Sequence, residues 1–160
     1  MEQHKVATLE TPRSEELGEL KIVGISRFYP FEKVGEIPDQ WQSFVPMMPL
    51  VAGDPSPVTY GVIYNGGDSS FDYLSGVELP PGKATPDNMV LLNVPPQTYV
   101  VFRHSGHVAT LRETCDAIWT DWLPQHGKTV VEAPWFERYG EQFDAVTGSG
   151  GLELWIPVED

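Results

Sequence analysis

The 160-residue sequence is poor in cysteine, in basic residues and in long hydrophobic runs. Cys115 is the only cysteine, so no disulfide can form within the chain and a reducing, cytoplasmic compartment is expected. No apolar run approaches the roughly 18 residues of a membrane-spanning helix, and the first residues lack the apolar segment of a signal peptide. These absences predict a cytoplasmic protein that has no membrane partner.

Basic residues are outnumbered: Lys and Arg total 10 against 23 Asp and Glu, which gives a formal net charge of -13. A surface of that sign repels phosphate groups, so direct binding to nucleic acid is not expected. The same surface attracts cations and speeds their arrival, although a net charge of this kind also serves solubility alone. The composition therefore favours a cationic partner without identifying it.

Motifs for metal, cofactor or nucleophile chemistry are weak or missing. His104 and His107 are three residues apart, but no fourth zinc ligand accompanies them and Cys115. No glycine-rich loop ends in Lys-Ser/Thr, and residues 148–151 are typical of a hairpin turn rather than of a nucleophile elbow. We therefore expect no metal, no cofactor and no catalytic residue of these classes.

An internal repeat organises the chain. Two amphipathic helices are predicted, each with apolar residues at i, i+4, i+7, i+8 and i+11, and each member of the second set lies 74 positions after its counterpart. The two sets are Ile37, Trp41, Phe44, Val45, Met48 and Leu111, Cys115, Ile118, Trp119, Trp122. Cys115 is thereby expected to be a buried small hydrophobe rather than a nucleophile.

One strand is predicted before each helix and two after it, which makes each half a β-α-β-β unit. The strands are expected at residues 20–28, 58–64 and 76–79, and at residues 97–104, 134–139 and 151–154. Short extra strands are expected at 6–11 and 89–94, and residues 11–18 read as a polar loop.

The fold class is therefore α+β: a single domain, residues 1–160, made of repeats at about 5–80 and 88–158. A mainly antiparallel sheet with both helices packed on it, pseudo-two-fold symmetry and a cleft between the repeats is expected. Clefts at such junctions are common ligand sites.

Five motifs together resemble one known family. They are residues 71–77, 99–106, 119–124, 152–158 and the run Phe136-Glu137-Arg138-Tyr139. Their order and spacing resemble the GyrI-like domains, which also form the effector-binding part of AraC-type and MerR-type multidrug-responsive regulators, and the match runs from about Lys5 to Val158. The resemblance implies a duplicated β-α-β-β fold that binds small molecules between its repeats. In drug-binding members a glutamate faces that cleft, and Glu137 matches it. The regulators' DNA-binding domain has no counterpart here, so no direct transcriptional role is expected.

The residues around Glu137 support a cation site independently of the resemblance. Alternation along a strand puts Trp135, Glu137 and Tyr139 on one face, and Phe136 and Arg138 on the other. A carboxylate between large rings is costly to bury unpaired, and a ligand cation relieves that cost while the π faces add attraction. The opposing interpretation, a glutamate on the solvent side of an amphipathic strand, stays open.

The repeat offset of 75 places Val62 at the position equivalent to Glu137, so Tyr60 and Tyr64 are expected to form the opposite wall. Tryptophans on the helix stripes pack in the core by default, yet Trp119 and Trp41 are candidates for pocket walls, with Trp155 a weaker one. The candidate ligand-binding residues are thus Glu137, Tyr139, Trp135, Tyr60, Tyr64, Trp119, Trp41 and Trp155.

Three functions remain open at this point. The first and favoured one is binding of a small lipophilic organic cation, as a sensor or sequestering protein, without turnover. The second is a hydrolase for electrophilic natural products that uses Glu137 with Tyr139 or Tyr64, although a second catalytic acid is missing. The third is an interaction module like the acidic gyrase inhibitors, with gyrase or a regulator as partner. Exposed strand edges also allow a homodimer.

Overall fold

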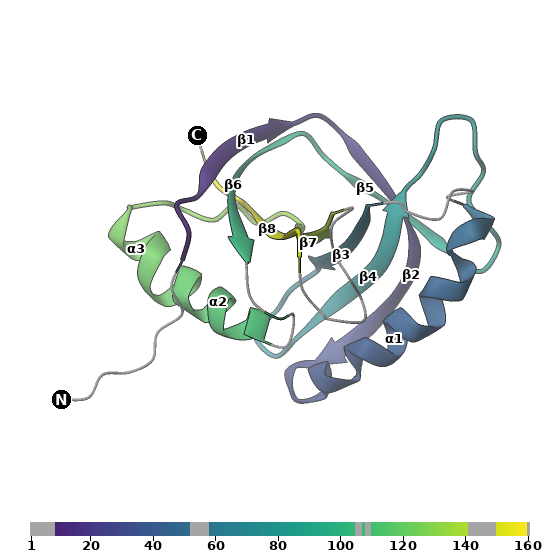
Figure 1. The fold of residues 1–160 in the computed structure, drawn as a ribbon, viewed down its shortest axis with the longest axis horizontal. Helices are drawn as coiled ribbons and strands as arrows, with labels where there is room; N and C mark the ends of the chain where they lie inside the picture. Colours follow the sequence, from purple (N-terminus) through teal and green to yellow (C-terminus); the bar gives the residue numbers. More distant parts are fainter. Residues whose placement is uncertain (1–8, 52–57, 105–106, 108–109, 141–149, 160) are drawn as a thin grey trace.

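The computed structural model describes residues 9–51, 58–104, 107, 110–140 and 150–159. Within them, one curled antiparallel sheet carries two helical segments on its outer face (Figure 1). The strands are β1 (Arg13–Leu17), β2 (Leu20–Pro30), β3 (Thr59–Tyr64), β4 (Ser70–Glu78), β5 (Val90–Val94), β6 (Gln97–His104), β7 (Trp135–Tyr139) and β8 (Leu152–Pro157). The helices are α1 (Ile37–Phe44), α2 (Leu111–Ala117) and α3 (Leu123–Gln125).

The strand order is β1-β6-β8-β7-β3-β4-β2-β5. From the centre outwards, β3, β4 and β2 on one side correspond to β7, β8 and β6 on the other. The outermost strands are exchanged, because β5 lies beside β2 and β1 lies beside β6. β7 and β3 pair at the centre, and every neighbouring pair is antiparallel. The predicted α+β class with a mainly antiparallel sheet and two main helical segments is confirmed. The strand order agrees with a duplication, which itself stays a prediction.

The register of the central pair decides which residues face the helices. Gly61 lies opposite Glu137, and Val62 lies opposite Phe136. Because paired residues share a face of the sheet, Glu137 faces the same side as Gly61, and Val62 faces the other side. The prediction that Val62 occupies the position equivalent to Glu137 is therefore wrong: the alignment is one residue out of step with the observed register, and a one-residue error exchanges the two faces of a strand.

Each face of the sheet buries its own core. Inside the curl lies a cluster of Leu20, Ile22, Tyr60, Val62, Leu74, Val94, Tyr99, Val101, Phe136 and Trp155. On the outer face, α2 contributes to a cluster with β6 and β8, and α1 packs Phe44 against Val23 and Val77. Burial of a side chain such as Phe44 contributes about 1.5–3 kcal/mol. Glu137 shares its face of β7 with Tyr139, which belongs to the outer cluster, so Glu137 faces the helices.

The helices differ from the predicted ones at their ends. The α-helical part of the first ends at Phe44 because Pro46 lacks an N–H, and the chain continues as a 3-10 turn over Val45–Leu50. In the second, α2 passes into a π-helical turn over Ile118–Trp122. Pro124 cannot donate to the carbonyl four residues earlier, and the Thr120 hydroxyl donates back to the Asp116 carbonyl at 2.6 Å, a bond that bends helices.

The segment from 11 to 18 differs most from its prediction. It contains β1, which pairs with β6 from Arg13 opposite Val101 to Leu17 opposite Gln97, so the prediction of a loop is wrong. The polar side chains concealed a strand whose stability comes from its backbone ladder and from the inward-facing Leu17, which packs against the inner core. The expected strand at 89–94 is confirmed as β5. Of the expected strand at 6–11, residues 6–8 lie outside the described residues, and residues 9–11 precede β1.

Candidate functional site

Glu137 is the only carboxylate in the described part of the chain that is bound by two tyrosine hydroxyls. Its Oε1 accepts hydrogen bonds from Tyr73 at 2.7 Å and from Tyr139 at 2.8 Å. Tyr73 comes from β4 and Tyr139 from the same strand as Glu137, two residues on. Two charge-assisted bonds to one oxygen fix the orientation of the carboxylate.

A third aromatic residue connects this carboxylate to α1. Trp41 donates from Nε1 to the Tyr73 hydroxyl at 2.9 Å, and its ring lies edge-on to Tyr139 with centroids 5.4 Å apart. The chain of donors therefore runs from α1 through β4 to Glu137 on β7. The Trp41–Tyr73 bond thus links α1 to the phenol that binds the carboxylate.

Gly61 makes room for this arrangement from the neighbouring strand. A Cβ at this position would collide with the Tyr73 hydroxyl and would lie 2.6 Å from Glu137 Oε1. A glycine inside a strand commonly marks the close approach of another group, and here that group is the bonded carboxylate and phenol. Residues 59–64 already showed this signal, since Gly61 interrupts an otherwise bulky strand.

Two further tryptophans lie beside the strand that carries Glu137. Trp119, in the π-helical turn, has its ring centroid 4.9 Å from that of Trp135 on β7, and Trp119 is 36% exposed. Short π-helical turns occur frequently at functional sites. The two rings form a partly exposed aromatic surface between the second helical segment and β7.

Electrostatics at Glu137 are unbalanced. Burial raises the pKa of Glu137, and the hydrogen bonds from Tyr73 and Tyr139 oppose that shift only in part. Burial, together with the adjacent carboxylate, raises the pKa of both tyrosines well above the ordinary value. Within the described residues, no Lys or Arg forms an ion pair with Glu137.

The second carboxylate oxygen, Oε2, accepts no hydrogen bond from the described residues. No described side-chain oxygen is both fully buried and unpaired, so Oε2 keeps some access to solvent. This oxygen is the free acceptor of the site.

Cys115 is half-buried and packs against the core cluster beneath α2. Burial, with a smaller contribution from Glu137, raises the pKa of the Cys115 thiol to about 12. A thiol with a pKa this high stays protonated near neutral pH. Among the described residues, no group of three His, Cys, Asp or Glu side chains could hold a metal ion, and none of the described helices is long and apolar enough to cross a membrane.

The eight sequence-derived candidates divide between the two faces of the sheet. Glu137, Tyr139, Trp135, Trp41 and Trp119 lie on the helix face. Tyr60 and Trp155 are buried in the inner core, and Tyr64 packs against it, with the Tyr64 and Ser26 hydroxyls 2.6 Å apart. The expectation that Tyr60 and Tyr64 form a wall opposite Glu137 is wrong, because the β3–β7 register turns them to the other face.

Sequence reasoning did not select Tyr73 or Gly61. Tyr73 lies in the motif of residues 71–77 that contributes to the family resemblance. Its contact with Glu137 depends on the registers of two strand pairs, β4 with β3 and β3 with β7, which no periodicity within one strand reveals.

A curled antiparallel sheet with two helical segments on one face, and a carboxylate held among aromatic rings there, define an effector-binding type of domain. Residues 10–159 match the family model of the GyrI-like small molecule binding domain. The chain belongs to this family and is a small-molecule binding domain.

Relatives of the chain include transcription regulators. The transcriptional regulator BrlR of Pseudomonas aeruginosa is 30% identical over 141 residues, which covers 86% of this chain and 51% of the relative. The chain thus spans about half the length of that curated relative.

Solved structures with the same fold include SAV2435 bound to tetraphenylphosphonium, with a TM-score of 0.74, 21% identity and coverage of 92% of this chain and 93% of that chain. A complex of EcmrR with DNA has a TM-score of 0.63, 18% identity and coverage of 93% and 57%.

Proposed function

We propose that the chain binds a small lipophilic organic cation at the helix-facing side of β7, with Glu137 as the counter-charge. The observation that carries the proposal is the state of one carboxylate. Its Oε1 is held by two tyrosine hydroxyls, its Oε2 is free, and no described basic residue pairs with it.

The energetic reason is the cost of an ionised carboxylate in poor contact with water. That cost is reduced when a counter-ion arrives or when the group takes up a proton. A ligand cation provides the first route, and the raised pKa of Glu137 reflects the second in the absence of ligand. The preference of the site for a cation therefore follows from a charge that the fold leaves uncompensated.

Aromatic rings supply the second part of the affinity. Trp41 and Tyr139 lie next to the carboxylate, and Trp135 and Trp119 extend the aromatic surface along β7. A cation over such a ring gains about 0.5–2 kcal/mol, depending on its exposure. A bulky apolar cation uses both the charge and the rings, whereas a hydrated metal ion uses only the charge.

Charge at long range acts in the same direction. The net charge of -13 raises the local concentration of cations around the chain. SAV2435, which shares the fold, has been solved with tetraphenylphosphonium, a cation of the proposed class. Since BrlR is a transcriptional regulator, we propose sensing or sequestering of such cations rather than their chemical conversion.

The test is a calorimetric titration with tetraphenylphosphonium and with neutral triphenylphosphine oxide, in the wild type, Glu137→Gln and Glu132→Gln. Glu132 is exposed, so its variant removes the same charge away from the site. The proposal predicts saturable binding of the cation, little binding of the neutral analogue, and at least tenfold weaker binding in Glu137→Gln, about 1.4 kcal/mol. Equal affinities in all three proteins would refute the assignment of Glu137.

A further inference from the structure

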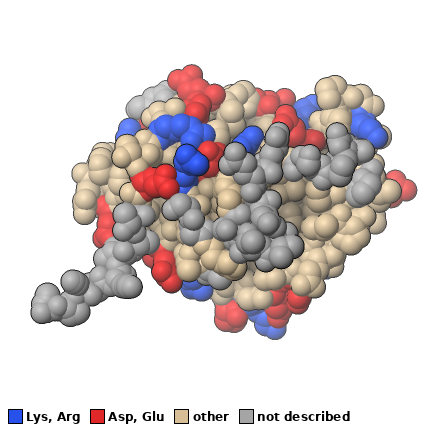
Figure 2. All heavy atoms as spheres, viewed as in Figure 1, with Lys and Arg blue, Asp and Glu red and all other residues tan. Residues whose placement is uncertain are grey.

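A group of arginines lies on the inner face of the sheet, away from Glu137. Arg103 on β6 and Arg138 on β7 both lie opposite Glu153 on β8, so the three charges form a row across adjacent strands. Arg13 on β1 reaches the same carboxylate. These are three of the 10 basic residues in a chain of net charge -13. On the face drawn in Figure 2, Lys and Arg gather over the region where Figure 1 shows β1 and β6.

The arginines are only partly neutralised. Arg13 lies 3.1 Å from Glu153 through Nη1 and 2.6 Å from Glu15 through Nε. Arg138 lies 3.9 Å from Glu153, too far for a hydrogen bond. Arg103 makes no ion pair with any described residue. Among the described residues, three guanidinium groups therefore share two carboxylates, Glu15 and Glu153.

Glu153 pairs closely with only one of the three arginines. Its Oε1 accepts a hydrogen bond from Trp155 Nε1 at 3.0 Å, and its Oε2 faces Arg13. The side chain is 14% exposed, and the arginines around it are more accessible. Both oxygens of Glu153 are thus engaged, and the direct pair with Arg13 leaves Arg103 and Arg138 without a close carboxylate partner among the described residues.

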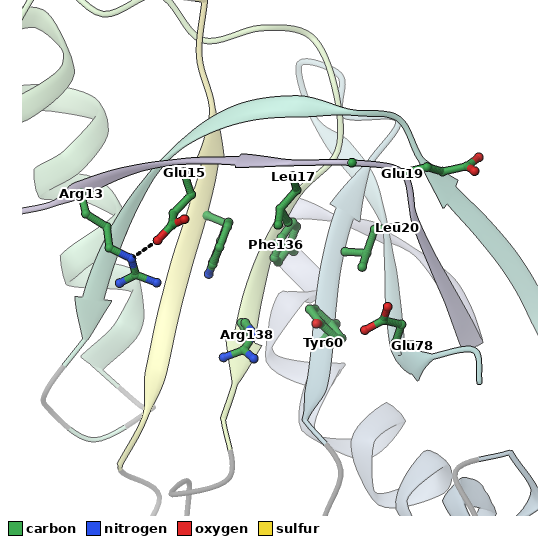
Figure 3. A pocket seen from close by; sticks show the side chains of 11 residues that line it. Arg13, Glu15, Leu17, Glu19, Leu20, Tyr60, Glu78, Phe136 and Arg138 are labelled. Carbon is green, nitrogen blue, oxygen red and sulfur yellow. Dashed lines mark hydrogen bonds and ion pairs between the residues drawn. The ribbon is translucent and has the colours of Figure 1, made fainter. Parts of the chain in front are cut away.

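Two hollows meet at these arginines. One, of about 360 Å³, is lined by all three arginines and Glu153. The other, of about 460 Å³, shares Arg13 and Arg138 with the first (Figure 3). Its apolar lining is Leu17, Leu20, Tyr60, Phe136 and Trp155.

The 460 Å³ hollow has an aromatic base and a far end that repels anions. In that base Phe136 and Trp155 are stacked at 5.5 Å with 15° between their planes, and Tyr60 stands edge-on to Phe136. Phe136 is fully buried, so Trp155 and Tyr60, each 6% exposed, present the aromatic surface of the hollow. Arg13 lies over the Trp155 ring at 5.6 Å. Glu19 and Glu78 line the end away from Arg13 in Figure 3, and Glu15, which pairs with Arg13, lines the near end. The positive charge of the combined space that has no close carboxylate partner in the described part of the chain is therefore that of Arg103 and Arg138.

We propose that these two hollows form a second ligand site, which takes an aromatic monocarboxylate. The carboxylate lies among Arg103, Arg138 and Arg13, where bidentate guanidinium contacts are available. The ring occupies the 460 Å³ hollow, against Leu17, Leu20 and the exposed parts of Tyr60 and Trp155. The site selects the charge opposite to that preferred at Glu137. It extends beyond the proposed function and does not depend on it.

Strand β7 separates the two sites. Glu137 faces the helices, and its neighbours Phe136 and Arg138 face the inner hollows. Alternation along a single strand thus assigns an anionic group to one face and a cationic group to the other.

The experiment is a calorimetric titration with 2-naphthoate, and with neutral 2-naphthalenemethanol for comparison. The variants are Arg103→Gln, Arg138→Gln, Glu137→Gln and, as a matched control, Arg112→Gln, which removes an exposed arginine of α2. We expect saturable naphthoate binding, weaker binding of the alcohol, and about tenfold loss in Arg103→Gln, the effect of one lost charge-assisted hydrogen bond. Circular dichroism confirms that each variant is folded.

Every outcome decides for or against the second site. Binding that survives in Glu137→Gln and Arg112→Gln but weakens in both Arg103→Gln and Arg138→Gln supports it. The proposal is overturned if naphthoate does not bind by about 1 mM, which is a weak affinity on the usual scale. It is also overturned if the alcohol binds equally well, if Arg112→Gln costs as much as Arg103→Gln, or if only Glu137→Gln removes binding. Failure of the cation titration leaves this result unaffected.

Discussion

Replacing Gly61 by alanine tests the geometry of the Glu137 site with a single methyl group. The new Cβ would collide with the Tyr73 hydroxyl, and it would lie 2.6 Å from Glu137 Oε1, well inside ordinary van der Waals contact. Tyr73 and Glu137 must therefore move apart or shift together, and their 2.7 Å hydrogen bond breaks or lengthens. Overpacking of this kind costs about 1–3 kcal/mol.

The affected groups have little room to adapt. Tyr73 is 1% exposed, its hydroxyl accepts from Trp41 Nε1, and its strand pairs with β2 and β3. We expect Gly61→Ala to lower the free energy of unfolding by about 1–3 kcal/mol. The variant should therefore unfold at a lower urea concentration than the wild type. We also expect its affinity for tetraphenylphosphonium to fall at least fivefold, because the carboxylate is no longer held by both tyrosines.

A second substitution separates the clash from a general loss of stability. Tyr73→Phe in the Gly61→Ala background removes the closest atom, while the ring carbon that carried it still lies 2.7 Å from the new Cβ. The pair should therefore recover part of the stability that additivity would predict to be lost, which a double-mutant cycle measures. Full additivity, or a Gly61→Ala protein with wild-type stability and affinity, would refute the described packing.

Three further predictions concern the ionisable groups. Burial raises the pKa of free Glu137, and a bound cation lowers it, so affinity for tetraphenylphosphonium should increase with pH until the free carboxyl is ionised. Calorimetry in buffers of different ionisation enthalpy should detect the proton released on binding, and Glu137→Gln should abolish that release. The same raised pKa means that the folded state holds a proton above pH 4.5 that the unfolded chain has lost, so the free energy of unfolding falls as pH rises from 4.5 through the folded pKa. Glu137→Gln should then be more stable than the wild type at pH 7 in urea unfolding, and a less stable variant would contradict this sign. Since the pKa of Cys115 is raised to about 12, a thiol reagent at pH 8 should label the native protein at least about 100-fold more slowly than the urea-unfolded protein, and equal rates would exclude a buried thiol.

The sequence predicted those features that depend on periodicity within one element. Alternation along β7 correctly assigned Trp135, Glu137 and Tyr139 to one face and Phe136 and Arg138 to the other. The helix stripes located both helical segments, and composition alone supported the acidic character.

Features that depend on register between strands could not be obtained in this way. The offset of 75 between repeats appeared to match Val62 with Glu137, but in the β3–β7 register Glu137 lies opposite Gly61. An error of one residue exchanges the faces of a strand, so Tyr60 and Tyr64 were assigned to the wrong side. Tyr73 was not selected for the same reason. The strand β1 was missed because two of its inward positions are the charged residues Arg13 and Glu15, which break the apolar alternation of a strand. These two side chains pair with each other, and Arg13 also pairs with Glu153 on β8, a contact that the sequence does not reveal.

The hydrolase and gyrase-inhibitor alternatives stay predictions, as do the homodimer and the absence of direct nucleic-acid binding. Their tests are separate from the binding test. Turnover of an electrophilic substrate that is lost in Glu137→Gln would support a hydrolase, whereas inhibition of gyrase that persists in the same variant would support an interaction module. Cation binding without turnover supports the sensor or sequestering role.

The central claim is that Glu137 is the counter-charge of a bound cation, and carbon NMR of the glutamate carboxyl groups tests it directly. With labelled glutamate, the Glu137 resonance is assigned as the one missing in Glu137→Gln, and its pH titration is followed with and without tetraphenylphosphonium. The account predicts a pKa above the ordinary value in the free protein and a clear decrease on saturation with the cation. A Glu137 titration that is the same with and without the bound cation would contradict it.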